Sequence, residues 1–185
     1  MDENLNTNEP EQTKELVKRT VTAHGRTMTL VGDEIKVGMP APDFKVIDNE
    51  MLPMKFIRTY KNRISLITSV PSLDTPVCDM ETRRFNKEAE SFSQDLNILA
   101  ISMDLPFAQK RWCGAAGINR LKTYSDYLKA DFGKSYGVLI KELRLLARAV
   151  FIVDKDGIVK YAQIVPETGN EPNYQEVLTA LKSVV

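Results

Sequence analysis

The sequence predicts an α/β fold with a mixed central sheet flanked by helices and with an added N-terminal β-hairpin. Through the middle of the chain, short apolar and β-branched runs alternate with helical segments, an order typical of parallel strands joined by right-handed crossovers. Two turn signals add antiparallel pairs, His24-Gly25 near the start and Asp156-Gly157 near the end. Together these observations indicate a mixed sheet.

Two regions of different composition divide the chain. Residues 1–17 are rich in Asn, Glu and Thr and have almost no apolar side chains, so they cannot bury enough surface to order themselves. We expect a flexible polar extension there. Residues 18–185 are expected to form one domain, because a chain of 185 residues with 43% hydrophobic residues can bury one good core.

The first part of this domain has the pattern of β structure. Residues 18–37 are rich in Thr and Val, alternate apolar with polar side chains and break at His24-Gly25, which predicts a hairpin. After a Gly- and Pro-rich stretch, residues 43–48 and a short segment around Lys55 are expected to pair as two more strands.

From residue 64 onward, strands and helices alternate. Residues 64–70 form an apolar, β-branched run of the kind that lies buried between helices. The segments expected after it are a helix at 76–91, a strand at 96–102, a helix at 106–116, a short strand near Leu121, a short helix at 127–136, strands at 148–154 and 158–165, and an amphipathic helix at 173–184. This arrangement suits a thioredoxin-like fold.

Charge and hydropathy exclude several classes of function. The chain has 25 acidic and 25 basic residues, so no global field would attract nucleic acid or an anionic membrane surface. It has no run of about 18 apolar residues that could span a membrane, and its first residues lack the pattern of a secretory signal. We therefore expect a cytoplasmic protein without nucleic-acid or membrane partners.

The cysteine count directs attention to thiol chemistry. The two cysteines are too few for a disulfide scaffold, and in a reducing compartment such a pair is catalytic, redox-sensing or merely buried. A single histidine, His24, leaves no plausible His/Cys zinc site. The chain also lacks a C-x-x-C pair and a Gly-rich phosphate loop, which argues against disulfide isomerases and nucleotide-binding folds.

Cys78 occupies a position that favours a reactive thiol. Thr75 and Pro76 form a helix-start signal after the buried strand, and this places Cys78 in the first helical turn. The free amides and positive dipole end of that turn stabilise a thiolate. Asp79 and Glu81 oppose it, so a nearby cation is needed. On this evidence alone, an inert buried cysteine is as open as a reactive one, and Thr75 is better explained as a structural cap than as a catalytic hydroxyl.

Three separate segments carry a family resemblance. Pro71, Thr75 and Cys78 match the P-x-x-x-[ST]-x-x-C motif of the peroxiredoxins, and P-S-L-D-T-P-V-C resembles the thiol peroxidase branch, the atypical two-cysteine type. The other two matches are M-D-L-P-F-A-Q-K-R-W-C-G, Met103 to Gly114, and L-L-A-R-A-V-F, Leu145 to Phe151. The resemblance runs from about residue 21 to the C-terminus and leaves the N-terminal extension without a counterpart.

This resemblance implies a role for each motif residue. Cys78 would be the peroxidatic cysteine, which attacks hydrogen peroxide or an organic hydroperoxide, while Thr75 and Arg148 hold the O–O bond in line. Arg148, which alone would suggest a surface cation, would also supply the positive charge that offsets Asp79. Pro71 would shield the thiolate and shape the pocket.

The resemblance also assigns the second cysteine. Cys113, on the expected helix that runs into Gly114 and Gly117, would be the resolving cysteine that forms an intramolecular disulfide with Cys78. Thioredoxin would reduce that disulfide, and the family implies a homodimer. No metal, haem or flavin is required, because sulfur itself carries the redox change. Local unwinding of one or both helix ends is expected during turnover, most easily at the glycines.

Two alternatives of other classes stay open. The pair could act as a redox sensor whose Cys78–Cys113 switch changes binding to a partner, or the domain could be a non-catalytic thioredoxin-like binding module. A peroxidase would consume NADPH continuously with thioredoxin, thioredoxin reductase and hydroperoxide. A sensor would oxidise once, and a binding module would leave both thiols inert to stoichiometric peroxide.

Overall fold

The computed structural model describes residues 19–88, 92 and 96–184. The polar extension expected at 1–17 and the last part of the helix expected to reach residue 91 lie outside the described residues. None of the described helices has both the length and the apolar character needed to cross a membrane.

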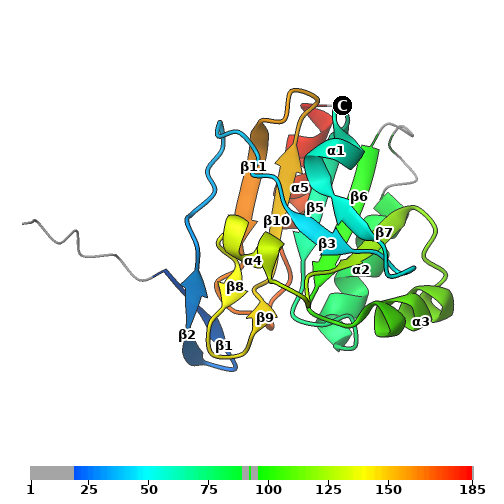
Figure 1. Ribbon diagram of the computed structural model, residues 1–185. Coiled ribbons are helices and arrows are strands. Elements are labelled where there is room, and N and C mark those ends of the chain that lie inside the picture. The colour runs from blue at the N-terminus through cyan, green and yellow to red at the C-terminus, as the bar shows by residue number, and fades with distance from the viewer. Residues whose placement is uncertain (1–18, 89–91, 93–95, 185) are drawn as a thin grey trace, which may run out of the picture.

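Within the described residues, seven strands form a central mixed sheet in the order β11-β10-β5-β6-β7-β3-β4 (Figure 1). Their bounds are β3 Lys45–Ile47, β4 Pro53–Lys55, β5 Ile64–Ser69, β6 Leu96–Ser102, β7 Leu121–Ser125, β10 Ala149–Val153 and β11 Val159–Ile164. Strands β5, β6 and β7 are parallel, whereas β10 runs antiparallel to both β5 and β11. The mixed sheet and the late hairpin expected from the sequence are therefore confirmed.

The N-terminal hairpin is also confirmed, and it belongs to a second, smaller sheet. Its strands are β1 Thr20–Ala23 and β2 Arg26–Val31. Strand β2 pairs with β8 Leu139–Ile140, which in turn pairs with β9 Leu145–Leu146. His24 and Gly25 have φ angles of 50° and 75°, the positive values that a tight type I′ turn requires. The sequence did not predict β8 and β9, because two-residue strands leave no alternating pattern to read.

Five helices within the described residues cover the sheet (Figure 1). They are α1 Phe56–Tyr60, α2 Pro76–Glu88, α3 Pro106–Ala116, α4 Asp131–Ser135 and α5 Tyr174–Lys182. The bounds of α3 agree with the prediction. The short helix expected at 127–136 begins only at Asp131, after Ala130 in the left-handed region, and the five-residue α1 was too short to predict.

Side-chain alternation along the buried strands divides the core into two layers. Leu66, Val150 and Ile152 pack with Phe85 of α2 and with residues of α5 on one face. Ile67 and Phe151 point the other way and pack with α1, α4 and the small sheet. Helices thus lie on both faces of the central sheet, as expected.

Strand register places the start of β10 against the end of β5. Ala149 pairs with Ser69, so the residue before β10, Arg148, lies next to the loop that leads from β5 into α2. That loop ends at Thr75, and Cys78 follows in the first turn of α2. Two segments distant in sequence therefore meet at one edge of the sheet.

Candidate active site

The loop between β5 and α2 is fastened to the end of β6 by one carboxylate. Asp104 accepts hydrogen bonds from Ser72 Oγ at 2.7 Å, from the Leu73 amide at 2.8 Å and from Ser102 Oγ at 2.7 Å. Within the loop, Thr75 Oγ1 donates to the Ser72 carbonyl at 3.0 Å. These bonds give the loop one defined path into α2.

Cys78 lies in the first turn of α2, as the sequence predicted. The Thr75 carbonyl accepts the Asp79 amide at 2.9 Å, which makes Thr75 the N-cap residue before the first helical residue, Pro76. Cys78 is fully buried and packs with Val70, Leu73 and the partly buried Trp112. Its thiol is free.

Arg148 is the cation at this thiol. Arg148 Nη2 donates to Cys78 Sγ at 3.3 Å and to the Thr168 carbonyl at 2.9 Å, while Arg148 Nε donates to the same carbonyl at 3.2 Å. The guanidinium Nη1 pairs with Glu81 Oε2. Arg148 is only 1% exposed, so it is a buried, fully engaged side chain and not the surface cation that its sequence context alone suggested.

Glu81 holds Arg148 in place from one turn beyond Cys78. Its other oxygen, Oε1, accepts from Thr68 Oγ1 of β5 at 2.5 Å, so each carboxylate oxygen has a partner. Burial raises the pKa of the Glu81 carboxyl, and the Arg148 guanidinium and the Thr68 hydroxyl oppose that rise. Burial also opposes the charge on Arg148, but Glu81 and Cys78 outweigh it and raise the pKa of the guanidinium. Arg148 therefore stays charged beside the sulfur.

The charge assignment expected from the sequence needs one correction. Asp79 is paired with Arg83, whose Nε lies 3.0 and 2.9 Å from the two carboxylate oxygens, and not with Arg148. Asp79 Oδ1 also accepts from Trp112 Nε1 at 3.0 Å. The i,i+4 spacing on one helix brings Asp79 and Arg83 together, whereas Arg148 is turned toward Glu81 and the thiol.

Cys113 has a different environment from Cys78. It lies in the last turn of α3, is half-buried and free, and its Sγ is 3.2 Å from Thr123 Oγ1 of β7. A cavity of about 340 Å³ opens beside it, lined by residues that include Asp48, Glu50 and Lys122. The two sulfurs therefore have separate partners and are not bonded to each other.

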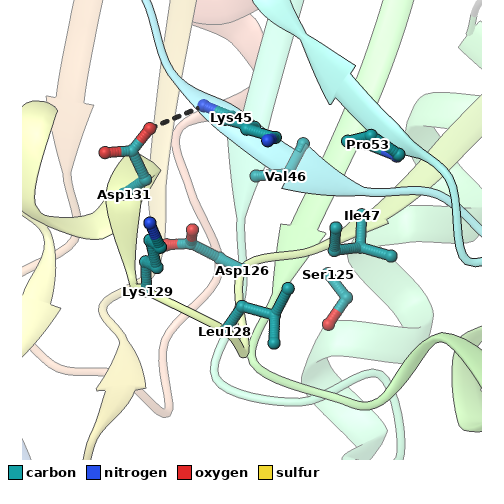
Figure 2. Close-up of a pocket in the computed structure, with 9 residues that line it drawn as sticks. All are labelled: Lys45, Val46, Ile47, Pro53, Ser125, Asp126, Leu128, Lys129 and Asp131. Carbon is teal, nitrogen blue, oxygen red and sulfur yellow. Dashed lines mark hydrogen bonds between the residues drawn. The ribbon is translucent and has the colours of Figure 1, made fainter.

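A larger cavity lies away from both cysteines, between β3, β7 and α4 (Figure 2). Its volume is about 400 Å³, and Figure 2 shows Asp131 at its rim, where a carboxylate oxygen accepts the Lys45 amide at 2.7 Å. The buried Asp126 carboxylate accepts the Phe132 and Gly133 amides at 3.2 and 2.8 Å, and burial raises its pKa to about 6. Because these bonds hold the first turn of α4, we assign the buried Asp126 carboxylate a structural role, the stabilisation of that turn.

The structure brings together four of the five site residues that the sequence singled out. Cys78 and Arg148 are in contact, and Pro71 and Thr75 lie half-buried in the loop that precedes Cys78. Cys113 lies on the neighbouring helix and faces β7.

Sequence reasoning missed the supporting roles of Glu81 and Asp104. Glu81 was considered only as a charge opposing the thiolate, although its position at i+3 from Cys78 puts both residues on one helix face. Asp104 lies inside the recognised segment from Met103 to Gly114, but nothing local indicates that it holds the Ser72–Leu73 backbone. Among the described residues, no three His, Cys, Asp or Glu side chains gather as a metal site would require.

The chain is similar in sequence to a known protein family and to named relatives. Residues 36–178 match the family described as Redoxin. The thiol peroxidase of Bacillus subtilis (strain 168) is 50% identical over 165 residues, covering 89% of this chain and 98% of that protein. The thiol peroxidase of Oceanobacillus iheyensis is 52% identical over 161 residues, covering 87% of this chain and 97% of that protein.

Solved structures show the same architecture. The crystal structure of a peroxiredoxin-like protein from Aquifex aeolicus has a TM-score of 0.83 and 43% identity, covering 90% of this chain and 98% of that one. A thiol peroxidase from Chromobacterium violaceum, at 21% identity and a TM-score of 0.80, shares the fold and covers 89% of this chain and 95% of that one. These likenesses confirm the thioredoxin-like fold that the sequence predicted.

Proposed function

Since this chain belongs to the Redoxin family, and within it to the thiol peroxidase branch of the peroxiredoxins, we propose a role for each cysteine. Cys78 is the thiol that reduces the peroxide, and Cys113 is the thiol that then forms a disulfide with the oxidised Cys78. The protein is a peroxidase that uses a cysteine thiol to reduce peroxides. The observation that carries the residue assignment is the contact of Arg148 Nη2 with Cys78 Sγ inside a fully buried site.

The first step would be attack by the Cys78 thiolate on the distal peroxide oxygen. The O–O bond breaks, the distal oxygen stays on sulfur as sulfenic acid, and the other oxygen takes a proton and leaves as water or an alcohol. Arg148 would stabilise the thiolate and the charge that develops on the leaving oxygen, since its planar fork can serve two acceptors at once. Thr75 and Pro71 lie in the loop that precedes Cys78. The Thr75 hydroxyl would orient the peroxide, and Pro71 would shield the thiolate.

The second step would join the two cysteines. The Cys113 thiol attacks the sulfenic sulfur of Cys78, the S–S bond forms and water leaves. A dithiol reductant of the thioredoxin type then reduces the disulfide by exchange and restores both thiols. Because Cys113 now faces Thr123 on β7, this step requires the end of α3 to open.

Two cysteine variants test the cycle. Cys78→Ser is expected to abolish peroxide reduction, because it removes the nucleophile. Cys113→Ser is expected to complete one turnover and leave a sulfenic acid on Cys78 that dimedone traps and mass spectrometry detects. Normal cycling of Cys113→Ser with thioredoxin would show that the second cysteine has no part in the reaction.

A coupled assay separates the peroxidase cycle from a redox sensor. With thioredoxin, thioredoxin reductase and NADPH, we expect continuous NADPH consumption when hydrogen peroxide or a bulky alkyl hydroperoxide is added. A single stoichiometric burst, with no further consumption, would favour the sensor. Running both peroxides side by side also gives the substrate preference.

We propose in addition that the protein acts as a homodimer. Leu105 and Phe107 at the start of α3 and Leu128 after β7 are 51%, 66% and 59% exposed. Their loops are adjacent, since Ser125 Oγ donates to the Asp104 carbonyl at 2.5 Å. An exposed apolar group of this kind supports a protein interface, and light scattering of the protein and of Phe107→Glu tests it.

The proposed cycle also favours a cytoplasmic location. Return of both thiols needs a compartment that supplies a dithiol reductant. The equal numbers of acidic and basic residues support a protein without nucleic-acid or membrane partners. Cell fractionation with detection of the protein in each fraction tests this proposal.

A further inference from the structure

A set of polar contacts fastens α2 to the last turn of α3. Asp79 binds Arg83 through both carboxylate oxygens and accepts from Trp112 Nε1 of α3. Arg83 Nη1 also donates to the Ala116 carbonyl at 2.9 Å. We call the Asp79, Arg83 and Trp112 side chains and the Ala116 carbonyl the interhelix clamp. It connects the helix of Cys78 with the helix of Cys113.

The clamp acts on the turn that carries Cys113. Ala116 is the last residue of α3, and the final carbonyls of a helix have no partner within it, so a guanidinium there stabilises the helix end. Gly117 caps the helix with a φ of 65°, and its amide and that of Ile118 donate to the Cys113 carbonyl. Arg83 therefore holds the same turn that must unwind to release Cys113.

The clamp also keeps the two sulfurs in their separate positions. Trp112 packs beside Cys78, whereas the adjacent Cys113 points to Thr123. A disulfide requires Cα atoms within about 7 Å and converging side chains. Turning Cys113 toward Cys78 would move Trp112 and Ala116, and this would break the bonds to Asp79 and Arg83.

We propose that the interhelix clamp is a brake on disulfide formation, with Arg83 as its positioning residue. While the clamp is closed, Cys78 can react with peroxide and Cys113 is held away. When it opens, the Cys113 thiol attacks the Cys78 sulfenic acid, the S–S bond forms and water leaves. This inference rests on the proposed function, because it concerns the rate of the second step.

The brake has a chemical consequence. A sulfenic acid that waits for Cys113 can meet a second peroxide, which oxidises the sulfur to sulfinic acid and is itself reduced to water or alcohol. Faster opening shortens that wait. A variant with a weakened clamp is therefore expected to resist inactivation by high peroxide concentrations.

Three substitutions on α2 test the brake. Arg83→Ala removes the bonds to Asp79 and Ala116, and Arg83→Lys keeps the charge but cannot reproduce the fork. Arg84→Ala is the matched control, because Arg84 is the next residue on the same helix and its Cζ lies 3.8 Å from the centre of the Tyr174 ring of α5. The reduced proteins are mixed with hydrogen peroxide without reductant.

The single tryptophan makes the two steps visible. Trp112 is the only tryptophan in the chain and belongs to the clamp, so its fluorescence should change when the clamp opens. The phase that depends on peroxide concentration reports sulfenic acid formation, and the phase that does not depend on it reports disulfide formation. Quenched samples analysed by dimedone labelling and mass spectrometry identify the species in each phase.

We expect Arg83→Ala to speed the concentration-independent phase by roughly two- to fivefold, the range that loss of a partly exposed ion pair allows. The rate of this phase in Arg83→Lys should lie between the rates of Arg83→Ala and the parent protein, and the rate in Arg84→Ala should equal that of the parent. The concentration-dependent phase should be the same in Arg83→Lys, Arg84→Ala and the parent, and no faster in Arg83→Ala, where Asp79 beside Cys78 has lost its cation. Added salt should speed the second phase of the parent but not that of Arg83→Ala.

Each opposing outcome has a distinct meaning. An unchanged or slower second phase in Arg83→Ala overturns the brake while leaving the two-cysteine cycle intact. Equal acceleration in Arg84→Ala also overturns it, because general loosening of α2 would then be the cause. If the parent forms no Cys78–Cys113 disulfide at all, the proposed function fails and the brake fails with it.

Discussion

Arg148 Nη2 lies 3.3 Å from Cys78 Sγ although 70 positions separate the two residues in the chain. Antiparallel pairing of β10 with β5 brings them together, since Ala149 is opposite Ser69. The same guanidinium binds Glu81 and the Thr168 carbonyl, so its direction is set from three sides. The reactivity of Cys78 should therefore depend on the shape of the Arg148 side chain as well as on its charge.

Arg148→Lys tests the need for the fork. The lysine ammonium keeps the positive charge, but it cannot donate to Cys78 and to Glu81 from two separate nitrogens as the guanidinium does. We expect the peroxide-dependent rate to fall by about 10²-fold, as when one donor to a developing charge is lost. Stopped-flow measurement of sulfenic acid formation checks this, with circular dichroism to verify the fold.

Lysine is the better replacement because Arg148→Ala would leave Glu81 buried without its cation, a change that costs about 3–5 kcal/mol in other proteins. The control is Arg144→Lys, a change of the same type at an exposed position nearby. A rate that is unchanged in Arg148→Lys would show that any cation at this place suffices.

A pair of substitutions at Glu81 separates orientation from charge. Glu81→Gln keeps an oxygen that can accept from Arg148, so the peroxide-dependent rate should stay within about threefold of the parent. Glu81→Ala removes the acceptor, and we expect about a tenfold slower reaction and a loss of about 3 kcal/mol in the free energy of unfolding. Urea unfolding and stopped-flow kinetics measure the two effects. Equal losses in both variants would mean that the negative charge itself is required.

Asp126 should make stability depend on pH. Its pKa in the folded protein is raised to about 6, mainly by burial, above its ordinary value of 3.8. As pH rises through this window the unfolded chain loses the proton first, so the folded state binds more protons and the free energy of unfolding falls. Because Asp126 is not completely buried, we expect the free energy of unfolding to decrease by only about 2 kcal/mol between pH 4 and pH 6.

The measurement is urea unfolding at a series of pH values for the parent and for Asp126→Asn. The amide nitrogen of the variant faces the Phe132 or Gly133 amide and this lowers its stability, so only the slopes are compared. A smaller slope in the variant supports the assignment. Identical slopes would assign the pH dependence to other groups.

Glu167 should stabilise the turn of the N-terminal hairpin at any pH above the pKa of its carboxyl in the folded protein. Its carboxylate accepts the His24 and Gly25 amides at 3.1 and 3.2 Å, and hydrogen bonds led by that of Thr22 lower its pKa to about 2. The stabilisation it supplies is therefore present above the ordinary pKa of 4.5 and is lost as pH falls through about 2.

Hydrogen exchange tests this assignment. Glu167→Ala is expected to speed amide exchange in β1 and β2 severalfold at neutral pH, because two turn amides lose their acceptor. Glu34→Ala is the control, since Glu34 lies close in sequence to the same hairpin and pairs with the exposed Lys36. Equal amide exchange rates in the two variants would show that Glu167 does not stabilise the hairpin.

Features that depend on near neighbours in the chain could be predicted from the sequence. The His24-Gly25 turn, the bounds of α3 and the position of Cys78 in a first helical turn all follow from a few adjacent residues. The mixture of parallel and antiparallel pairs in the sheet could be predicted in the same way, because it follows from turn residues and from the alternation of strands and helices along the chain.

Which charged groups meet could not be predicted from the sequence and became clear in the folded chain. The sequence indicated that Asp79 and Glu81 need a cation, but the folded chain pairs Asp79 with Arg83 and Glu81 with Arg148. It also turned Cys113 toward Thr123, and it completed the small sheet with β8 and β9. Such contacts depend on strand register and helix packing over the whole chain, and a local pattern carries no information about either.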